Sequence, residues 1–325
     1  MTIPPCVHFC WIGASLPWAY VFAVLSAAER SELPEIILHH TDVLEDGAEL
    51  RALRNAPRVR LSRIDPFACL TEAGRALGVG GELAALYRRL ASPVMRADIL
   101  RAAILYLQGG VYLDLDTVTT ASLLPLLNTP QFVGSEFIVW PHWVRASHSP
   151  VVWARHLSLD LIRKALRQMP QGWRTFRRVE KFYFRGVNNA VMGAAANSRL
   201  ISEYLQAMLT VPPERLTQAY ALGPDLLQEM VDRSPQDDLT IQEPRVFYPL
   251  PPEISEHWFR IGRTVRLDAV LSAETRVAHW YASVRTKSRV ARIDPDYVRA
   301  HREHQLYSAL VYSCIRNLPG AAFRG

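Results

Sequence analysis

The sequence predicts an α/β protein with a mostly parallel central sheet and a more helical second half. In the first half, short apolar runs alternate with amphipathic helical stretches, an order typical of parallel strands joined by helices. The chain has 325 residues, of which 49% are hydrophobic and 21% charged, so it can form a large packed core. No internal repeat or low-complexity segment interrupts it.

Turn and capping signals mark the elements of the first half. The best-marked helix starts at Pro93, which suits a first helical turn, and ends at Gly109 and Gly110. Apolar residues recur at helical spacing between these limits. The predicted strands are residues 6–12, 35–40, 58–64 and 111–115, and the predicted helices are residues 18–30, 45–54 and 93–108.

The second half is more helical and less regular. Asp294 and Pro295 form a good helix start, and we expect this last helix to continue toward Arg316. The other predicted helices are residues 151–169, 199–210 and 225–231. No linker rich in Gly or Ser separates independent domains, so we expect one domain whose two halves are residues 1–140 and 141–325.

The net charge of +6 is unevenly distributed, with twelve Arg or Lys against five acidic residues in the segment 260–325. A solvated arginine-rich face explains this most simply. An anionic membrane surface, contacted by a basic C-terminal helix, or a phosphate-bearing substrate would also explain it. No nucleic-acid-binding motif accompanies the charge, so we expect no nucleic-acid partner.

Other patterns bear on the compartment. No apolar run reaches the roughly 18–20 residues of a membrane-spanning helix, and the N-terminus lacks a basic leader. The four cysteines have no metal-binding spacing, which favours free thiols in a reducing compartment. We therefore expect a cytoplasmic protein, with peripheral contact at the inner face of the membrane as a further hypothesis.

The segment 96–117 carries the strongest chemical signal. On a strand, Tyr112, Asp114 and Asp116 share one face, while the intervening Val111, Leu113 and Leu115 point into a core. Two carboxylates at the end of a buried strand are costly unless a cation or a donor network compensates their charge. A divalent cation with oxygen ligands does so, and its remaining positions suit a diphosphate. The pattern thus predicts a metal–diphosphate site.

This segment resembles the DXD sugar-binding region of glycosyltransferase family 32, which is distantly related to the glucosyltransferase domains of clostridial toxins. The matching residues are Asp98, Arg101, Gly109, Gly110, Tyr112, Asp114 and Asp116, while Gln108 replaces the usual tyrosine. The resemblance implies a GT-A-like fold with a nucleotide-sugar-binding half (1–140) and an acceptor-side half (141–325). It also implies a UDP- or GDP-sugar donor, Mn²⁺ (or Mg²⁺) as cofactor, and retaining transfer to a glycan or glycoconjugate.

The resemblance also implies roles for the residues of this segment. Asp116 would ligate the metal directly and Asp114 would act through the ribose or a water, so both are the predicted catalytic residues. Asp98 and Arg101 would hold the donor sugar, together with Tyr112 of the same motif. The simpler alternative for Asp98 and Arg101 is an ion pair on a helix surface.

Weaker similarities lie outside this segment. Trp11, in a strand like the family's opening one, would stack near the nucleotide base, or else be a core aromatic. Asn188 and Asn189, followed by a helix of small residues, would line the donor, with a helix N-cap as the alternative. His279 would be a further metal ligand, or else a packed histidine, and Ser283 would be a donor contact. Gly223-Pro224 also resembles a family element, which is equally a helix start.

Together these observations predict a hexosyltransferase for surface polysaccharide or glycoconjugate synthesis. A haloacid-dehalogenase-type phosphatase is one alternative, because Asp114, Asp116 and Thr117 follow an apolar strand as its first motif does. That motif normally opens its domain and needs a later lysine, whereas over 110 residues precede it here and the only lysines are Lys164, Lys181 and Lys287. A non-catalytic scaffold with a transferase-like fold is the other alternative.

Overall fold

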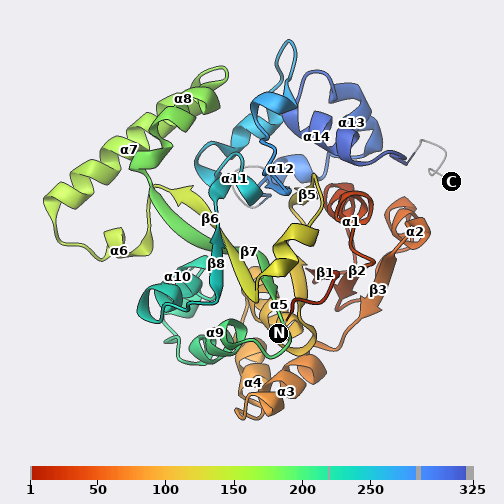
Figure 1. Cartoon of the computed structure of the whole chain (residues 1–325), viewed down its shortest axis with the longest axis vertical. Coiled ribbons are helices and arrows are strands. Elements are labelled where there is room, and N and C mark those ends of the chain that lie inside the picture. The colour runs from red at the N-terminus through yellow and green to blue at the C-terminus, as the bar shows by residue number, and fades with distance from the viewer. Residues whose placement is uncertain (1, 219, 283–286, 320–325) are drawn as a thin grey trace.

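The computed structural model describes residues 2–218, 220–282 and 287–319 (Figure 1). The strands are β1 (Cys6–Trp11), β2 (Glu35–His40), β3 (Val59–Arg63), β4 (Gly110–Leu113), β5 (Thr117–Thr119), β6 (Gln131–Ile138), β7 (Phe184–Ala194), β8 (Leu239–Gln242) and β9 (Val277–His279). The α-helices are α1 (Trp18–Arg30), α2 (Ala48–Asn55), α3 (Pro66–Ala76), α4 (Glu82–Arg89), α5 (Pro93–Gln108), α6 (His142–Arg145), α7 (Pro150–Gln168), α8 (Gly172–Val179), α9 (Arg199–Leu209), α10 (Pro224–Arg233), α11 (Pro244–Phe247), α12 (Lys287–Val290), α13 (Pro295–His301) and α14 (Leu306–Cys314). Short 3₁₀ helices are η1 (Leu124–Asn128), η2 (Glu180–Phe182), η3 (Arg215–Thr217), η4 (Pro252–Phe259) and η5 (Leu267–Ala269).

The main sheet confirms the predicted α/β class with mostly parallel strands. Within the described residues it has seven strands in the order β3-β2-β1-β4-β7-β6-β8. Strands β3, β2, β1 and β4 run parallel, as do β6 and β8, whereas β7 is antiparallel to both β4 and β6. A second, small sheet pairs β5 with β9 in antiparallel fashion. Because β7 lies between β4 and β6, the two halves of the chain share one sheet.

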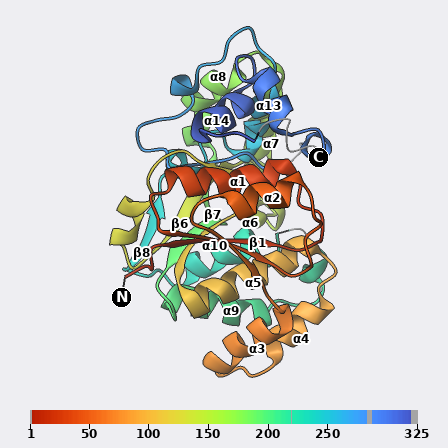
Figure 2. The same cartoon turned by 90° about the vertical axis from the view of Figure 1, so that its right-hand side faces the viewer.

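Helices cover both faces of the main sheet (Figure 2). Helices α1 and α2 lie on one face and α5 and α9 on the other. Side chains of β4 point alternately to the two faces of the sheet. Val111 and Leu113 pack in the core beside α1, and Tyr112 packs in the core beside α5. Asp114 follows directly at the carboxyl end of β4, where ligands bind in open α/β sheets.

Two predicted elements differ in the structure. The segment around Asn188 and Asn189 is not a helix cap before a helix, because both residues lie within the strand β7. A Cβ at Gly193 would come within 2.1 Å of the Phe132 ring, so the small residues of β7 permit close packing in a central strand. The last helix breaks into α13 and α14, and the segment Leu306–Cys314 contains no Lys or Arg. The expected continuous helix is therefore divided into α13, which carries Arg299, and α14, which carries no basic residue.

The Gly109–Gly110 turn between α5 and β4 accepts a hydrogen bond from the buried His8, which in turn contacts the buried His39. Both glycines have positive φ, and a Cβ at Gly110 would lie 2.8 Å from His8 Nε2. His8 Nε2 donates to Gly109 O at 2.8 Å, and His39 Nε2 lies 3.0 Å from His8 Nδ1. His8 of β1 thus fixes the start of β4, the strand that leads to Asp114.

Helices α7 and α8 project from one side of the molecule (Figure 1). In the described parts of the chain, no helix combines the length and the apolar character that crossing a membrane requires. The cytoplasmic location stays a prediction from the sequence.

Candidate active site

Helix α5 supplies two charged side chains to the interior. Asp98 and Arg101 lie one turn apart and are only 3% and 4% exposed, so they are not the surface ion pair that was the alternative. Arg101 Nη2 lies 3.4 Å from Asp98 Oδ1, which also accepts from Asn189 Nδ2 at 2.8 Å. Burial raises the pKa of Asp98, although Arg101 and the Asn189 hydrogen bond oppose the rise.

Arg101 forms a bidentate ion pair with Asp114. Its Nη1 donates to Asp114 Oδ2 at 3.1 Å, and its Nη2 lies 2.9 Å from Asp114 Oδ1. The same guanidinium lies 4.8 Å from the centre of the Tyr112 ring, and Tyr112 donates to Asp114 Oδ1 at 3.2 Å. Burial raises the pKa of Asp114 to about 6 even though Arg101 favours its charged form. Helix α5 and strand β4 therefore orient this carboxylate together.

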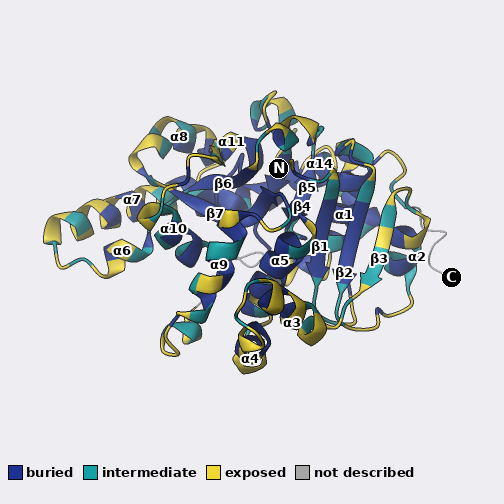
Figure 3. Ribbon diagram, turned by 60° about the horizontal axis from the view of Figure 1, so that its bottom comes forward, coloured by how far each residue is buried: buried dark blue, intermediate teal, exposed yellow. Residues whose placement is uncertain are grey.

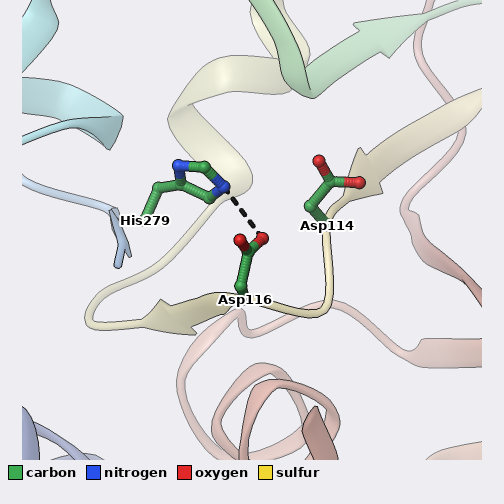
Figure 4. A group of neighbouring side chains, drawn as sticks. All are labelled: Asp114, Asp116 and His279. Carbon is green, nitrogen blue, oxygen red and sulfur yellow. Dashed lines mark hydrogen bonds and ion pairs between the residues drawn. The ribbon is translucent and has the colours of Figure 1, made fainter. Parts of the chain in front are cut away.

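Asp116 meets His279 through the small sheet (Figure 4). Pairing of β5 with β9 places Thr117 opposite His279, and His279 Nε2 lies 2.8 Å from Asp116 Oδ1. The backbone N–H of Ala282 donates to Asp116 Oδ2 at 2.7 Å. Burial would raise the pKa of Asp116, but the charge and hydrogen bond of His279 and the Ala282 hydrogen bond together outweigh burial and lower it. Burial would lower the pKa of His279, but the charge and hydrogen bond of Asp116 together with the charges of Asp114 and Glu136 outweigh burial and raise it.

A third buried carboxylate, Glu136 on β6, faces the same space. Its two oxygens accept from Asn188 Nδ2 at 2.6 Å and from the Tyr281 hydroxyl at 2.6 Å. Burial raises the pKa of Glu136, while these two hydrogen bonds oppose the rise. Asn188 also accepts from the Ala190 N–H at 2.7 Å, so its side-chain orientation is defined.

The charged groups of the site line one cavity of about 370 Å³. Its lining includes Asp98, Arg101, Asp114, Asp116, Glu136, Asn188, Asn189, His279 and Tyr281. It also includes Trp140, His142, Arg145, Phe184, Tyr220 and Asp225. The volume is typical of small-ligand pockets, and the mixture of aromatic rings with polar groups suits a sugar ligand.

Three side chains in this cavity fit a divalent cation. Asp114, Asp116 and His279 each offer one ligand atom, and these atoms all lie within 4.8 Å of one another. Nδ1 of His279 is buried without a hydrogen-bond partner among the described residues. Two carboxylate oxygens and an imidazole nitrogen form a donor set that suits first-row divalent ions. The chain therefore offers a divalent-metal site where the sequence predicts one.

The structure thus brings together most of the predicted site residues: Asp98, Arg101, Tyr112, Asp114, Asp116, Asn188, Asn189 and His279. Trp11 is not among the residues that line the cavity; its ring lies 5.1 Å from that of Tyr20. Ser283 lies outside the described residues. Gly223-Pro224 does begin a helix, α10, and Pro224 lines the cavity.

Sequence reasoning missed Glu136, Tyr281 and Tyr204. Tyr204 on α9 lies 3.2 Å from Asn189 Nδ2 and donates to the Leu222 carbonyl at 2.6 Å. None of the three belongs to a local motif, and each reaches the site through pairing or packing distant in sequence. Glu136 is the only charged residue of the largely buried strand β6, and this is the one signal that the sequence offered.

The comparisons with known proteins agree with this geometry. Residues 69–133, from within α3 to β6, match the family described as "Glycosyltransferase sugar-binding region containing DXD motif". The resemblance to the DXD sugar-binding region that the sequence predicts is confirmed over these residues. A search of curated protein sequences found no match.

Several solved structures share parts of the fold. Mouse xyloside xylosyltransferase 1 is similar over 84% of this chain and 96% of its own, at 14% identity and a TM-score of 0.46. The glycosyltransferase PaToxG covers 72% of this chain and 71% of its own, at 12% identity and a TM-score of 0.43. The galactosyltransferase LgtC, solved with donor and acceptor sugar analogues, covers 91% and 99%, at 12% identity and a TM-score of 0.39.

Proposed function

We propose that this protein is a retaining hexosyltransferase that uses Mn²⁺ to transfer a sugar from a nucleoside-diphosphate sugar to a saccharide acceptor. The observation that carries the proposal is the cluster of Asp114, Asp116 and His279 beside the buried Asp98–Arg101 pair in one cavity. The resemblance to family 32 supports retaining transfer and a UDP- or GDP-sugar. Residues 1–140 would bind the donor and residues 141–325 would shape the acceptor side.

In this proposal Asp116 and His279 bind the cation directly. Asp114 lies beside them and is oriented by Arg101. A divalent cation held there would neutralise the negative charge that develops on the leaving diphosphate. Arg101 and Tyr112 contact the oxygens of Asp114, and His279 and Ala282 contact those of Asp116. The resemblance supports the division of roles, in which Asp116 ligates the cation directly and Asp114 acts through a water or the ribose.

Asp98 is suited to hold the donor sugar. Its Oδ2 is buried and has no hydrogen-bond partner among the described residues, although Asp98 lines the cavity. An acceptor atom left unpaired in a protein interior is costly, and a sugar hydroxyl would satisfy it. Arg101, fixed by Asn189 O at 2.8 Å, keeps Asp98 in place.

The test is release of nucleoside diphosphate from a panel of UDP- and GDP-sugars, with Mn²⁺ or with EDTA. We expect slow cleavage of one donor that requires the metal and is lost in Asp116→Asn. Asp268→Asn is the matched control, because this exposed carboxylate pairs with Arg266 and does not line the cavity. Full turnover by Asp116→Asn would refute the assignment of the metal site.

The same experiment separates the alternatives. A phosphatase would release inorganic phosphate from phosphate esters and use Asp114 as nucleophile, but Arg101 and Tyr112 engage that carboxylate. None of the described residues that line the cavity is a lysine. Absence of both donor cleavage and donor binding by calorimetry would favour the non-catalytic scaffold.

A further inference from the structure

Helix α7 has an apolar side that faces away from the protein. Its exposed apolar residues include Val151 (76% exposed), Leu157 (50%), Leu161 (66%) and Ile162 (42%). On a helical projection these residues, together with exposed Ala154, Ser158 and Ala165, fall on one side, which we call the outer face of α7. Figure 3 shows this projecting helix with exposed residues along it.

The inner side of α7 combines two core leucines, Leu159 and Leu166, with buried polar side chains. Asp160 and Arg163 are largely buried there, and Arg163 Nη1 pairs with Glu253 Oε2 at 2.6 Å. His156 is also buried and bonds the Val139 carbonyl at 2.6 Å. A surface helix normally places its apolar residues inward and its polar residues outward. In α7 apolar residues lie on the outward side as well, and these side chains are available to a partner.

Basic side chains lie beside the outer face. The segment 150–185 contains nine Arg or Lys and two acids, Asp160 and Glu180. Lys164 pairs with Asp160, and three acids outside the segment pair with its arginines: Glu253 with Arg163, Glu256 with Arg167 and Glu243 with Arg185. Arg155 and Lys164 flank the outer face on opposite sides of the helix. Arg155 donates to the Phe182 carbonyl at 3.2 Å, so η2, with exposed Lys181 and Phe182 (52% exposed), lies beside α7.

We propose that the outer face of α7 binds an anionic lipid membrane. An apolar helix face flanked by Lys and Arg is the pattern of helices that lie in the plane of a bilayer, with apolar side chains among the acyl chains and cations at the headgroups. Exposed aromatic residues such as Trp143 and Phe182 suit the interfacial region. A second copy of this chain is a poorer partner, because the surrounding positive charges of two copies would repel each other.

The inner side of α7, opposite the outer face, borders the active-site cavity. Arg163 of α7 lines that cavity, as do Trp140, His142 and Arg145 of the segment that leads into the helix. If the protein acts as proposed above, membrane binding through α7 would place the cavity beside the bilayer, where a lipid-linked saccharide is presented. Membrane binding itself does not depend on the proposed reaction.

Vesicle pelleting tests this surface. The full-length protein is mixed with phosphatidylcholine vesicles with or without phosphatidylglycerol, at low and high salt. We expect binding only with phosphatidylglycerol, weaker at high salt, and reduced about tenfold or more by Leu157→Gln combined with Leu161→Gln. Val43→Gln combined with Ile261→Gln is the matched control, because these side chains are 64% and 62% exposed elsewhere.

The outcomes are distinct. Loss of binding in the α7 variant but not in the control, with unchanged melting temperature and unchanged donor hydrolysis in solution, would support the proposal. Vesicle binding that is equally strong without phosphatidylglycerol would overturn the proposal, as would vesicle binding that the α7 variant retains. A dimer in lipid-free solution that the same variant dissociates would also overturn it, in favour of self-association. Because donor hydrolysis is measured separately, failure of the proposed reaction would not be confused with failure of membrane binding.

Discussion

Replacement of Arg101 by methionine tests the charge arrangement at the centre of the site. The guanidinium contacts Asp114 at 2.9 and 3.1 Å and Asp98 at 3.4 Å, and both it and Asp98 are almost fully buried. Removing one partner of a buried ion pair leaves uncompensated charge and costs about 3–5 kcal/mol. A chain of 325 residues unfolds with an entropy of about 0.7 kcal/mol/K, so the melting temperature should fall by about 6 °C.

The assay is thermal unfolding followed by circular dichroism, together with donor hydrolysis. Arg199→Met is the matched control, because its side chain is 64% exposed and should change stability by less than about 0.5 kcal/mol. Adding Asp98→Asn to Arg101→Met removes one of the two stranded charges, so the double variant should recover about 1–3 kcal/mol while donor hydrolysis stays lost. A single variant that melts like the wild type, or a double variant less stable than the single, would refute the reasoning.

Two further predictions concern other buried groups. Glu136→Gln should slow transfer to the acceptor about tenfold with little change in nucleoside-diphosphate binding, because the amide presents a donor where the carboxylate accepts from Tyr281. Steady-state kinetics would measure the transfer rate, and calorimetry with UDP and GDP would measure binding. Equal losses in the transfer rate and in nucleoside-diphosphate affinity would show that the role of Glu136 is only structural. Burial lowers the pKa of His8 to about 4 and that of His39 to about 3, from 6.5, so both stay neutral in the folded protein. The unfolded chain binds protons at these histidines below pH 6.5, whereas the folded protein does not. The free energy of unfolding is therefore unaffected by them above pH 6.5 and falls as the pH decreases toward 4, by about 2 kcal/mol per histidine at pH 5. His39→Gln should therefore remove about 2 kcal/mol of the difference in urea-unfolding free energy between pH 7 and pH 5, and an unchanged difference would contradict this account.

The sequence by itself determined the elements around the metal site. Proline at the start of α5, two glycines at its end and the strand after them are local signals, so the helix, turn and strand follow from neighbouring residues. The spacing of Asp114 and Asp116 on a buried strand predicted a metal–diphosphate site, and the resemblance added Asp98 and Arg101 to it. The resemblance supplied His279, which no local pattern distinguishes from a packed histidine.

Only the tertiary structure decided how the second half completes the site. The segment of β7 has small residues that are compatible with a helix, yet pairing with both β4 and β6 makes it a central strand and brings Asn188 to Glu136. Tyr281 reaches the same carboxylate from a segment 145 positions away. The outer face of α7 likewise became visible only when the inner face was seen to be occupied by ion pairs. Local propensity is worth tenths of a kcal/mol per residue, whereas burial and strand pairing act over the whole element, so the longer-range interactions prevail where the two conflict.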